Sequence, residues 1–206
     1  VQPSAGSAVL NRVTGGEVSQ LLGQLQSNGR VFLINPSGIV IGAGARIDTN
    51  SFVASTLDIA DADFLAGRLR FLASAGAGGI RNDGVITAGP GGSIALIAPD
   101  IVNSGIIQTE GGNILLAAGR SIEITSADLD GVRFEIQAPT DAVLNLGKLL
   151  ADNGAVRAFA GTLHNSGVVR ADRLVQDADG TVQLVASGDL TQTAGASVSA
   201  SGLSGG

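Results

Sequence analysis

Short apolar segments alternate with polar, glycine-containing corners along most of the chain. Residues 31–34 and 39–41 are aliphatic or aromatic, and residues 35–38 between them read Asn-Pro-Ser-Gly. These four residue types suit the successive positions of a type I turn. The β-branched and aliphatic residues on both sides favour strands. The pattern therefore predicts two strands joined by a tight, rigid corner.

An Asn-x-Gly unit followed by aliphatic residues recurs at a nearly constant spacing. Its asparagines, Asn82, Asn103, Asn145 and Asn165, are separated by 21, 42 and 20 residues. The interval of 42 is interpreted as two periods with one degenerate turn between them. A second, out-of-phase series of strands is introduced by glycines, which are Gly92, Gly112, Gly131, Gly154 and Gly180. Each period therefore holds at least two short strands, whose alternating residues predict one buried and one exposed face.

A period near twenty residues built from short strands is typical of a solenoid. Helical repeats need helical periodicity, and a propeller blade takes about 40 residues. The sequence therefore predicts an all-β fold, a right-handed parallel β-helix with about ten coils of roughly 20 residues. The four repeated asparagines are expected at one corner, where their amides stack in a ladder. Independent turn-forming asparagines would not require a common spacing.

Residues 17–29 fit both a helix and a strand, because their leucines recur at helical spacing and also alternate. Gly23 in the middle of the segment disfavours a helix, and Asn28-Gly29 is a strong corner signal. We therefore expect a strand that ends at a corner.

Residues 55–71 break the repeat and contain Asp58, Asp61 and Asp63. We expect one extra-helical loop there, with a short helical turn capped by Asp61. Closely spaced carboxylates also suit Ca²⁺. The segment lacks a glycine-spaced ligand loop, however, and acidic residues are favourable at a helix N-terminus. The sequence therefore predicts no metal site.

Composition narrows the function classes. The chain has 206 residues, of which 44% are hydrophobic and 3% aromatic, and it has no cysteine, which excludes disulfides and thiolate sites. The net charge is −6 and the basic residues are scattered, which argues against a nucleic-acid partner. No apolar run has the length of a membrane span or the form of a signal peptide. Because the chain opens on Val1 within its own pattern, we expect it to be a piece of a longer protein.

Three runs carry a specific resemblance: AVLNRVTGG at 8–16, NGRVFLINPSGIVIGAGA at 28–45 and VASTLDIADADFLAG at 53–67. Together they resemble the secretion domain of two-partner-secretion exoproteins, the filamentous-haemagglutinin-like family. The resemblance covers residues 1–130 without the family's N-terminal cap. Residues 131–206 continue the repeat style and are expected to belong to the adhesin shaft.

The resemblance implies export across the outer membrane of a Gram-negative bacterium in an unfolded form, through a dedicated barrel transporter. The transporter's periplasmic domains would recognise an asparagine-arginine pair and an Asn-Pro-Asn-Gly motif, whose third position is serine here. The implied recognition residues are Asn11, Arg12, Asn35, Pro36, Ser37 and Gly38. The product would be secreted or held at the cell surface, and its distal shaft would bind a receptor on a host or neighbouring cell.

Three functions remain open from the sequence. The first is a non-enzymatic module, without a cofactor, that heads an adhesin filament. The second is a contact-dependent toxin carrier, and the third is a β-helical enzyme acting on polysaccharides. His164 is the only histidine, and the sequence shows no evident serine or aspartate partner for it as a base. From turn chemistry alone, Asn35→Asp is expected to cost little stability, because a carboxylate also accepts hydrogen bonds.

Overall fold

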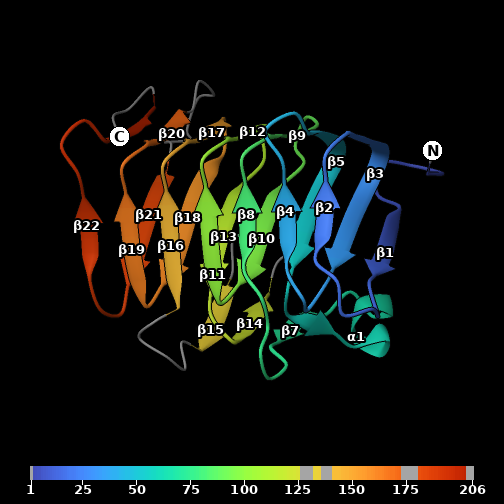
Figure 1. Ribbon diagram of the computed structural model, residues 1–206. Coiled ribbons are helices and arrows are strands. Elements are labelled where there is room, and N and C mark those ends of the chain that lie inside the picture. Colours follow the sequence, from blue (N-terminus) through green and yellow to red (C-terminus); the bar gives the residue numbers. More distant parts are fainter. Residues whose placement is uncertain (1, 126–131, 136–140, 173–180, 203–206) are drawn as a thin grey trace.

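The chain folds as a parallel β-helix, as the repeat predicted. A computed structural model describes residues 2–125, 132–135, 141–172 and 181–202. The coils stack into a rod with β1 at one end and β22 at the other (Figure 1). In the described residues, no helix is long and apolar enough to cross a membrane.

Each coil contributes strands to three columns of parallel neighbours. The first column contains β1 (Ala8–Arg12), β3 (Gln24–Ile34), the C-terminal half of β5 (Arg46–Ser55), β10 (Ile94–Ala98), β13 (Ile114–Ala118), β18 (Ala155–Ala160) and β21 (Thr181–Ala186). The second contains β2 (Ser19–Leu21), β4 (Ile39–Ile41), β8 (Ile80–Asn82), β11 (Asp100–Asn103), β16 (Ala142–Asn145), β19 (Thr162–Asn165) and β22 (Leu190–Gln192). The third contains the N-terminal halves of β3 and β5, then β9 (Val85–Ala88), β12 (Ile106–Glu110), β17 (Lys148–Asp152), β20 (Val168–Asp172) and β23 (Ser197–Ser201).

The second column has seven strands, so the described residues form seven coils where the period predicted about ten. The interpretation of the 42-residue interval was wrong. Asn103 pairs directly with Asn145 in the β11–β16 ladder, so the interval is a single coil and not two. The extra residues leave the coil and return to the same column.

Two excursions form a small antiparallel sheet beside the rod, where one extra-helical loop was predicted (Figure 1). Its elements are β6 (Asp58–Ile59), α1 (Asp61–Leu65), β7 (Leu69–Leu72), β14 (Ser121–Ile124) and β15 (Val132–Glu135). The segment assigned to the glycine-introduced series after Gly131 is therefore not a coil strand, because β15 pairs antiparallel with β14. Gly131 itself and Gly180 lie outside the described residues.

The predicted helical turn is present as α1, but Asp61 is not its cap. The N-cap residue is Ala60, which makes no side-chain capping bond, and Asp61 lies in the first turn. Its carboxylate is instead paired with Arg12.

Residues 17–29 form strands and no helix, as expected, and Asn28-Gly29 lies at a corner, because β3 passes there from the third column to the first. Both residues lie inside β3, where the pairing with β5 shifts register between Ser27 and Arg30. At this bend β3 has one residue more than β5 between the paired positions, which is the pattern of a β-bulge, a structure in which glycine is common.

The core has two parts. One lies inside the coils, where aliphatic residues from all three columns meet, among them Ile41, Ile86 and Leu116. The other lies between the first column and the antiparallel sheet and includes Phe32 and Phe71. The first column is thus covered on both faces, which explains why β10 and β13 are continuously apolar while β12 alternates.

Candidate functional site

The predicted corner at residues 35–38 is a closed turn between β3 and β4. The Gly38 amide donates to the Asn35 carbonyl oxygen at 3.1 Å, and the Ser37 amide donates to Asn35 Oδ1 at 2.9 Å. Gly38 has a φ of +124°, which residues with a Cβ rarely adopt. The Pro36 carbonyl accepts from the Gly78 amide at 2.8 Å, which attaches the corner to the following coil.

The Asn35 side chain also holds the preceding coil. Its Nδ2 donates to the Glu17 carbonyl oxygen at 2.9 Å and to Ser19 Oγ at 2.8 Å. Asn35 is 0% exposed, whereas Glu17 is exposed and Ser19 is half-buried, so the two donated bonds join the buried amide to the rim of the preceding coil. The Asn35 amide therefore has two structural roles. Its Oδ1 accepts a hydrogen bond within the turn, and its Nδ2 donates hydrogen bonds to the preceding coil.

These contacts remove the basis of the expectation that Asn35→Asp costs little stability. A carboxylate preserves acceptance at Oδ1 but places a second acceptor against the Glu17 carbonyl, on a side chain that is itself fully buried. Turn chemistry alone did not reveal this, because Glu17 and Ser19 come from another coil.

The asparagine-arginine pair lies one coil before the corner. Asn11 is opposite Leu33, and Arg12 is opposite Ile34, in the parallel pairing of β1 with β3. The two predicted motifs are therefore on neighbouring strands at the same end of the first column. The exposed Asn11 side chain donates only one long hydrogen bond, to the Phe32 carbonyl oxygen at 3.5 Å.

Arg12 clamps the first excursion to the rod. Its Nε is 3.0 Å from Asp58 Oδ1, its Nη1 is 2.6 Å from Asp61 Oδ1, and its Nη2 donates to the Ile59 carbonyl. The hydrogen bond that Arg12 donates to Asp61, with the charge of Asp58, raises the pKa of Arg12 above its ordinary value. The guanidinium is therefore held in its charged form by the two carboxylates.

The four repeated asparagines stack on successive coils. Asn82 Nδ2 donates to Asn103 Oδ1 at 2.8 Å, and Asn103 Nδ2 donates to Asn145 Oδ1 at 2.9 Å. Asn145 Nδ2 then donates to Asn165 Oδ1 at 2.8 Å. All four are at most 2% exposed, so the amides satisfy one another where water cannot. The donors all point toward the C-terminal coil, and Asn165 Nδ2 at the end of the row has no partner among the residues that the structure describes.

The aspartates considered for calcium are used by arginines. Asp58 and Asp61 bind Arg12, and Asp63 lies 2.8 Å from Arg68 Nε. Within the part of the chain that the structure describes, no group of three or more candidate ligands has a metal-binding arrangement.

His164 does have a serine partner, contrary to the sequence interpretation. Its Nε2 lies 2.9 Å from Ser166 Oγ, two residues along the chain. The contact joins adjacent outward-facing residues of one corner, and no pocket of the described residues that we identify contains either of them. The contact is therefore a local one within a single turn.

Sequence reasoning missed the groups that complete the site. Ser19 and the backbone of Glu17 hold Asn35, and Asp58 and Asp61 hold Arg12. From the sequence, Asp58 and Asp61 were considered as possible metal ligands, and Asp61 also as a helix cap, but not as partners of Arg12. The available signal for the pairing of Arg12 with these aspartates was the presence of an arginine in the family motif of a chain with many carboxylates.

Comparisons with known proteins agree with this geometry. The family model of the TPS secretion domain matches residues 1–200, which extends past residue 130. The solved HMW1 secretion domain from Haemophilus influenzae is similar, with a TM-score of 0.90 and 40% identity, over 97% of this chain and 54% of that one. Two heme/hemopexin-binding proteins of Haemophilus influenzae are 48% and 43% identical over 58 residues, which is 28% of this chain. Those residues are only 6% of each relative's length. The chain belongs to the TPS secretion domain family, the secretion domains of two-partner exoproteins.

Proposed function

We propose that this domain directs export of a longer exoprotein through a dedicated outer-membrane transporter, whose periplasmic domains bind the chain before it folds. The observation that supports this most is the complete burial of Asn35. A transporter has no access to that amide in the folded domain. Recognition of the corner therefore requires an unfolded or extended chain.

Two other predicted recognition residues are also partly inaccessible to a transporter in the folded domain. Gly38 is buried, and Arg12 is occupied by two carboxylates and a backbone carbonyl. In an unfolded chain the asparagine, arginine and corner groups are all free to bind a partner. Folding then withdraws them, so binding before folding and release afterwards follow from the same contacts.

The finer role is that of a non-enzymatic head of a β-helical adhesin at the bacterial surface, with residues 131–206 as the start of its shaft and without a cofactor. The described strands after residue 141 continue all three columns of the domain, which supports a template on which further coils stack. A receptor on a host or neighbouring cell would be bound by the distal shaft. A toxin carrier would use the same head, and the sequence that follows the domain distinguishes the two.

A peptide-binding experiment tests recognition without folding. A synthetic peptide of residues 8–45 holds less than two complete coils, and a solenoid unit cannot bury its hydrophobic face alone. We expect it to bind the periplasmic domains of the cognate transporter, and Asn35→Asp to weaken binding while Asn11→Gln has a smaller effect. Equal affinity of the wild-type and Asn35→Asp peptides would contradict recognition of the corner amide.

Export in cells separates recognition from stability. Asn103→Ala breaks the buried ladder far from the corner, so it destabilises the folded domain without changing the recognition motif. We expect that variant to be exported and Asn35→Asp to be retained. Equal loss of export in the two variants would mean that folding stability alone governs secretion.

A further inference from the structure

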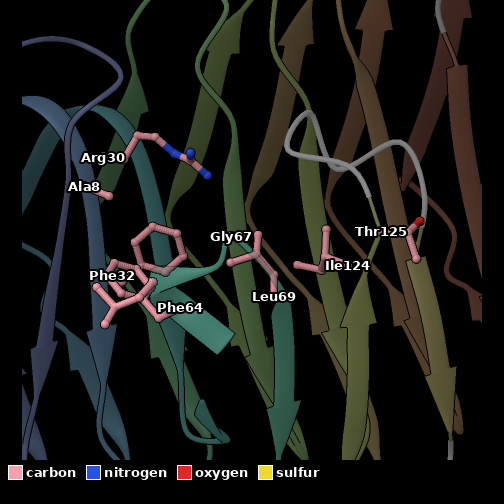
Figure 2. Close-up of a pocket in the computed structure, with 9 residues that line it drawn as sticks. Ala8, Arg30, Phe32, Phe64, Gly67, Leu69, Ile124 and Thr125 are labelled. Carbon is pink, nitrogen blue, oxygen red and sulfur yellow. The ribbon is translucent and has the colours of Figure 1, made fainter. Parts of the chain in front are cut away.

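A cavity of about 370 Å³ lies where the first excursion meets the rod, separate from the corner and the clamp. Figure 2 shows its walls, which come from β1, β3, α1, β7 and β14. Phe32, Leu69 and Ile124 are at most 6% exposed and form its apolar lining. Its volume is in the range of about 300–1,000 Å³ typical of small-molecule sites.

The aromatic side of the cavity is shaped by one contact across the two layers. The rings of Phe32 and Phe64 meet edge to face, with centroids 5.1 Å apart and planes at 78°. This contact positions α1 against the rod. Leu65, the next residue of α1, also lines the cavity and is 83% exposed, so apolar surface extends from the interior to the rim.

Arg30 supplies the cavity's cationic group. Its guanidinium carbon lies 5.6 Å from the centre of the Phe32 ring, an arrangement that holds the charge over the aromatic face (Figure 2). Among the described residues Arg30 has no carboxylate partner. Other arginines of the described chain do have one, and these are Arg12, Arg68, Arg70, Arg81, Arg120 and Arg170.

Within the described part of the chain, the half-buried guanidinium of Arg30 makes no ion pair. The guanidinium offers a planar pair of donors that matches a carboxylate. The apolar lining below it matches a hydrocarbon or aryl group. Charge and shape therefore complement the same kind of molecule, one with an anionic head and an apolar body.

We propose that this cavity binds a small soluble amphipathic carboxylate, with the acid on Arg30 and the apolar group between Phe32, Phe64 and Leu69. This activity belongs to the folded, exported domain and is independent of recognition by the transporter. Thr125 also lines the cavity, at the opposite end from Arg30 in Figure 2.

Calorimetric titration of the folded domain tests the proposal, with laurate below its micellar concentration as the probe. We expect saturable binding at one site. Arg30→Gln is expected to weaken it about tenfold or more, because a charge-assisted bond is lost. Arg46→Gln is the matched control, since Arg46 is exposed and also lacks a counter-ion in the described chain. Phe64→Ala is expected to weaken binding without unfolding the rod, which a thermal melt verifies.

Two further binding experiments, one with a cationic amphiphile and one with lipid vesicles, identify the class of ligand. Dodecyltrimethylammonium has the same chain length with a positive head, and we expect it not to bind. Equal binding of the two amphiphiles, or unchanged laurate affinity in Arg30→Gln, would overturn the proposal. Phosphatidylglycerol vesicles that co-sediment the wild type but not Arg30→Gln, without laurate binding, would assign the cavity to a membrane surface and also overturn it.

Discussion

The substitution Asn35→Asp tests the double role of the corner amide most directly. The change keeps the size of the side chain and its acceptor for the Ser37 amide. It removes the two hydrogen bonds that Nδ2 donates to Glu17 and Ser19. Because Asn35 is 0% exposed, the introduced carboxylate loses most of its solvation in the folded domain.

Asn35→Asp is expected to lower the free energy of unfolding by a large amount, although it changes only one heavy atom. Burying an uncompensated charge by removing its partner costs about 3–5 kcal/mol, and the two lost bonds contribute to that total. For a domain of this size, each kcal/mol lowers the melting temperature by about 2–4 °C. The variant is therefore expected to melt roughly 6–20 °C below the wild type at neutral pH.

The cost should also depend on pH. Burial without a cation raises the pKa of the introduced carboxyl above its unfolded value of about 3.9. The folded variant then holds a proton that the unfolded chain releases, so its stability is greatest below that unfolded value. As pH rises toward the raised pKa, the difference from the wild type should grow, and above it the difference should stay constant.

Thermal melts followed by circular dichroism between pH 4 and pH 8 measure both effects. Asn11→Asp is the matched control, because Asn11 is exposed and makes one long bond, so its effect should stay within about 0.5 kcal/mol. The role assigned to Nδ2 would be refuted if the Asn35→Asp domain melted within 2 °C of the wild type. It would also be refuted if the difference in melting temperature did not change with pH.

Three other changes test separate parts of the fold. Arg12→Ala should release the first excursion, so hydrogen exchange should accelerate in α1 while the coil strands stay protected. Gln192→Asn should extend the ladder, because residue 192 pairs with Asn165, whose Nδ2 lacks a partner; we expect a gain of about 0.5–1.5 kcal/mol in urea unfolding. Gly105→Ala would place a Cβ 2.1 Å from the carbonyl oxygen of the glycine one coil before it, and should prevent stable folding, whereas Gly15→Ala, with nothing within 4 Å, should be neutral.

The spacing of Asn-x-Gly units predicted which side chains stack, because each coil returns its asparagine to the same corner. The same spacing could not predict how many coils lie between Asn103 and Asn145. A parallel ladder requires only that the chain return in register, and an excursion such as β14–β15 changes the length of a coil without changing its pairing. Alternation was misleading in the first column for a related reason, since its outer face is covered by residues far away in sequence.

In the candidate site, too, the sequence predicted the local features but not the contacts between distant residues. Local chemistry predicted the turn at residues 35–38, because asparagine, proline and glycine determine a corner through their own backbones. The partners of the Asn35 amide come from the preceding coil, and those of Arg12 come from the following excursion. No local pattern relates residues that are 16 to 49 positions apart.

Burial of Asn35 also gives the proposed export a direction. If the periplasmic domains hold the corner in an extended chain, the first coil cannot dock, because Glu17 and Ser19 need the same amide. Folding of the first two coils and binding to the transporter are then mutually exclusive. Release outside the cell supplies the free amide, the corner closes, and the following coil attaches through the Pro36 carbonyl. Under this proposal, the buried contacts that stabilise the folded domain would also be the ones that prevent its return to the transporter.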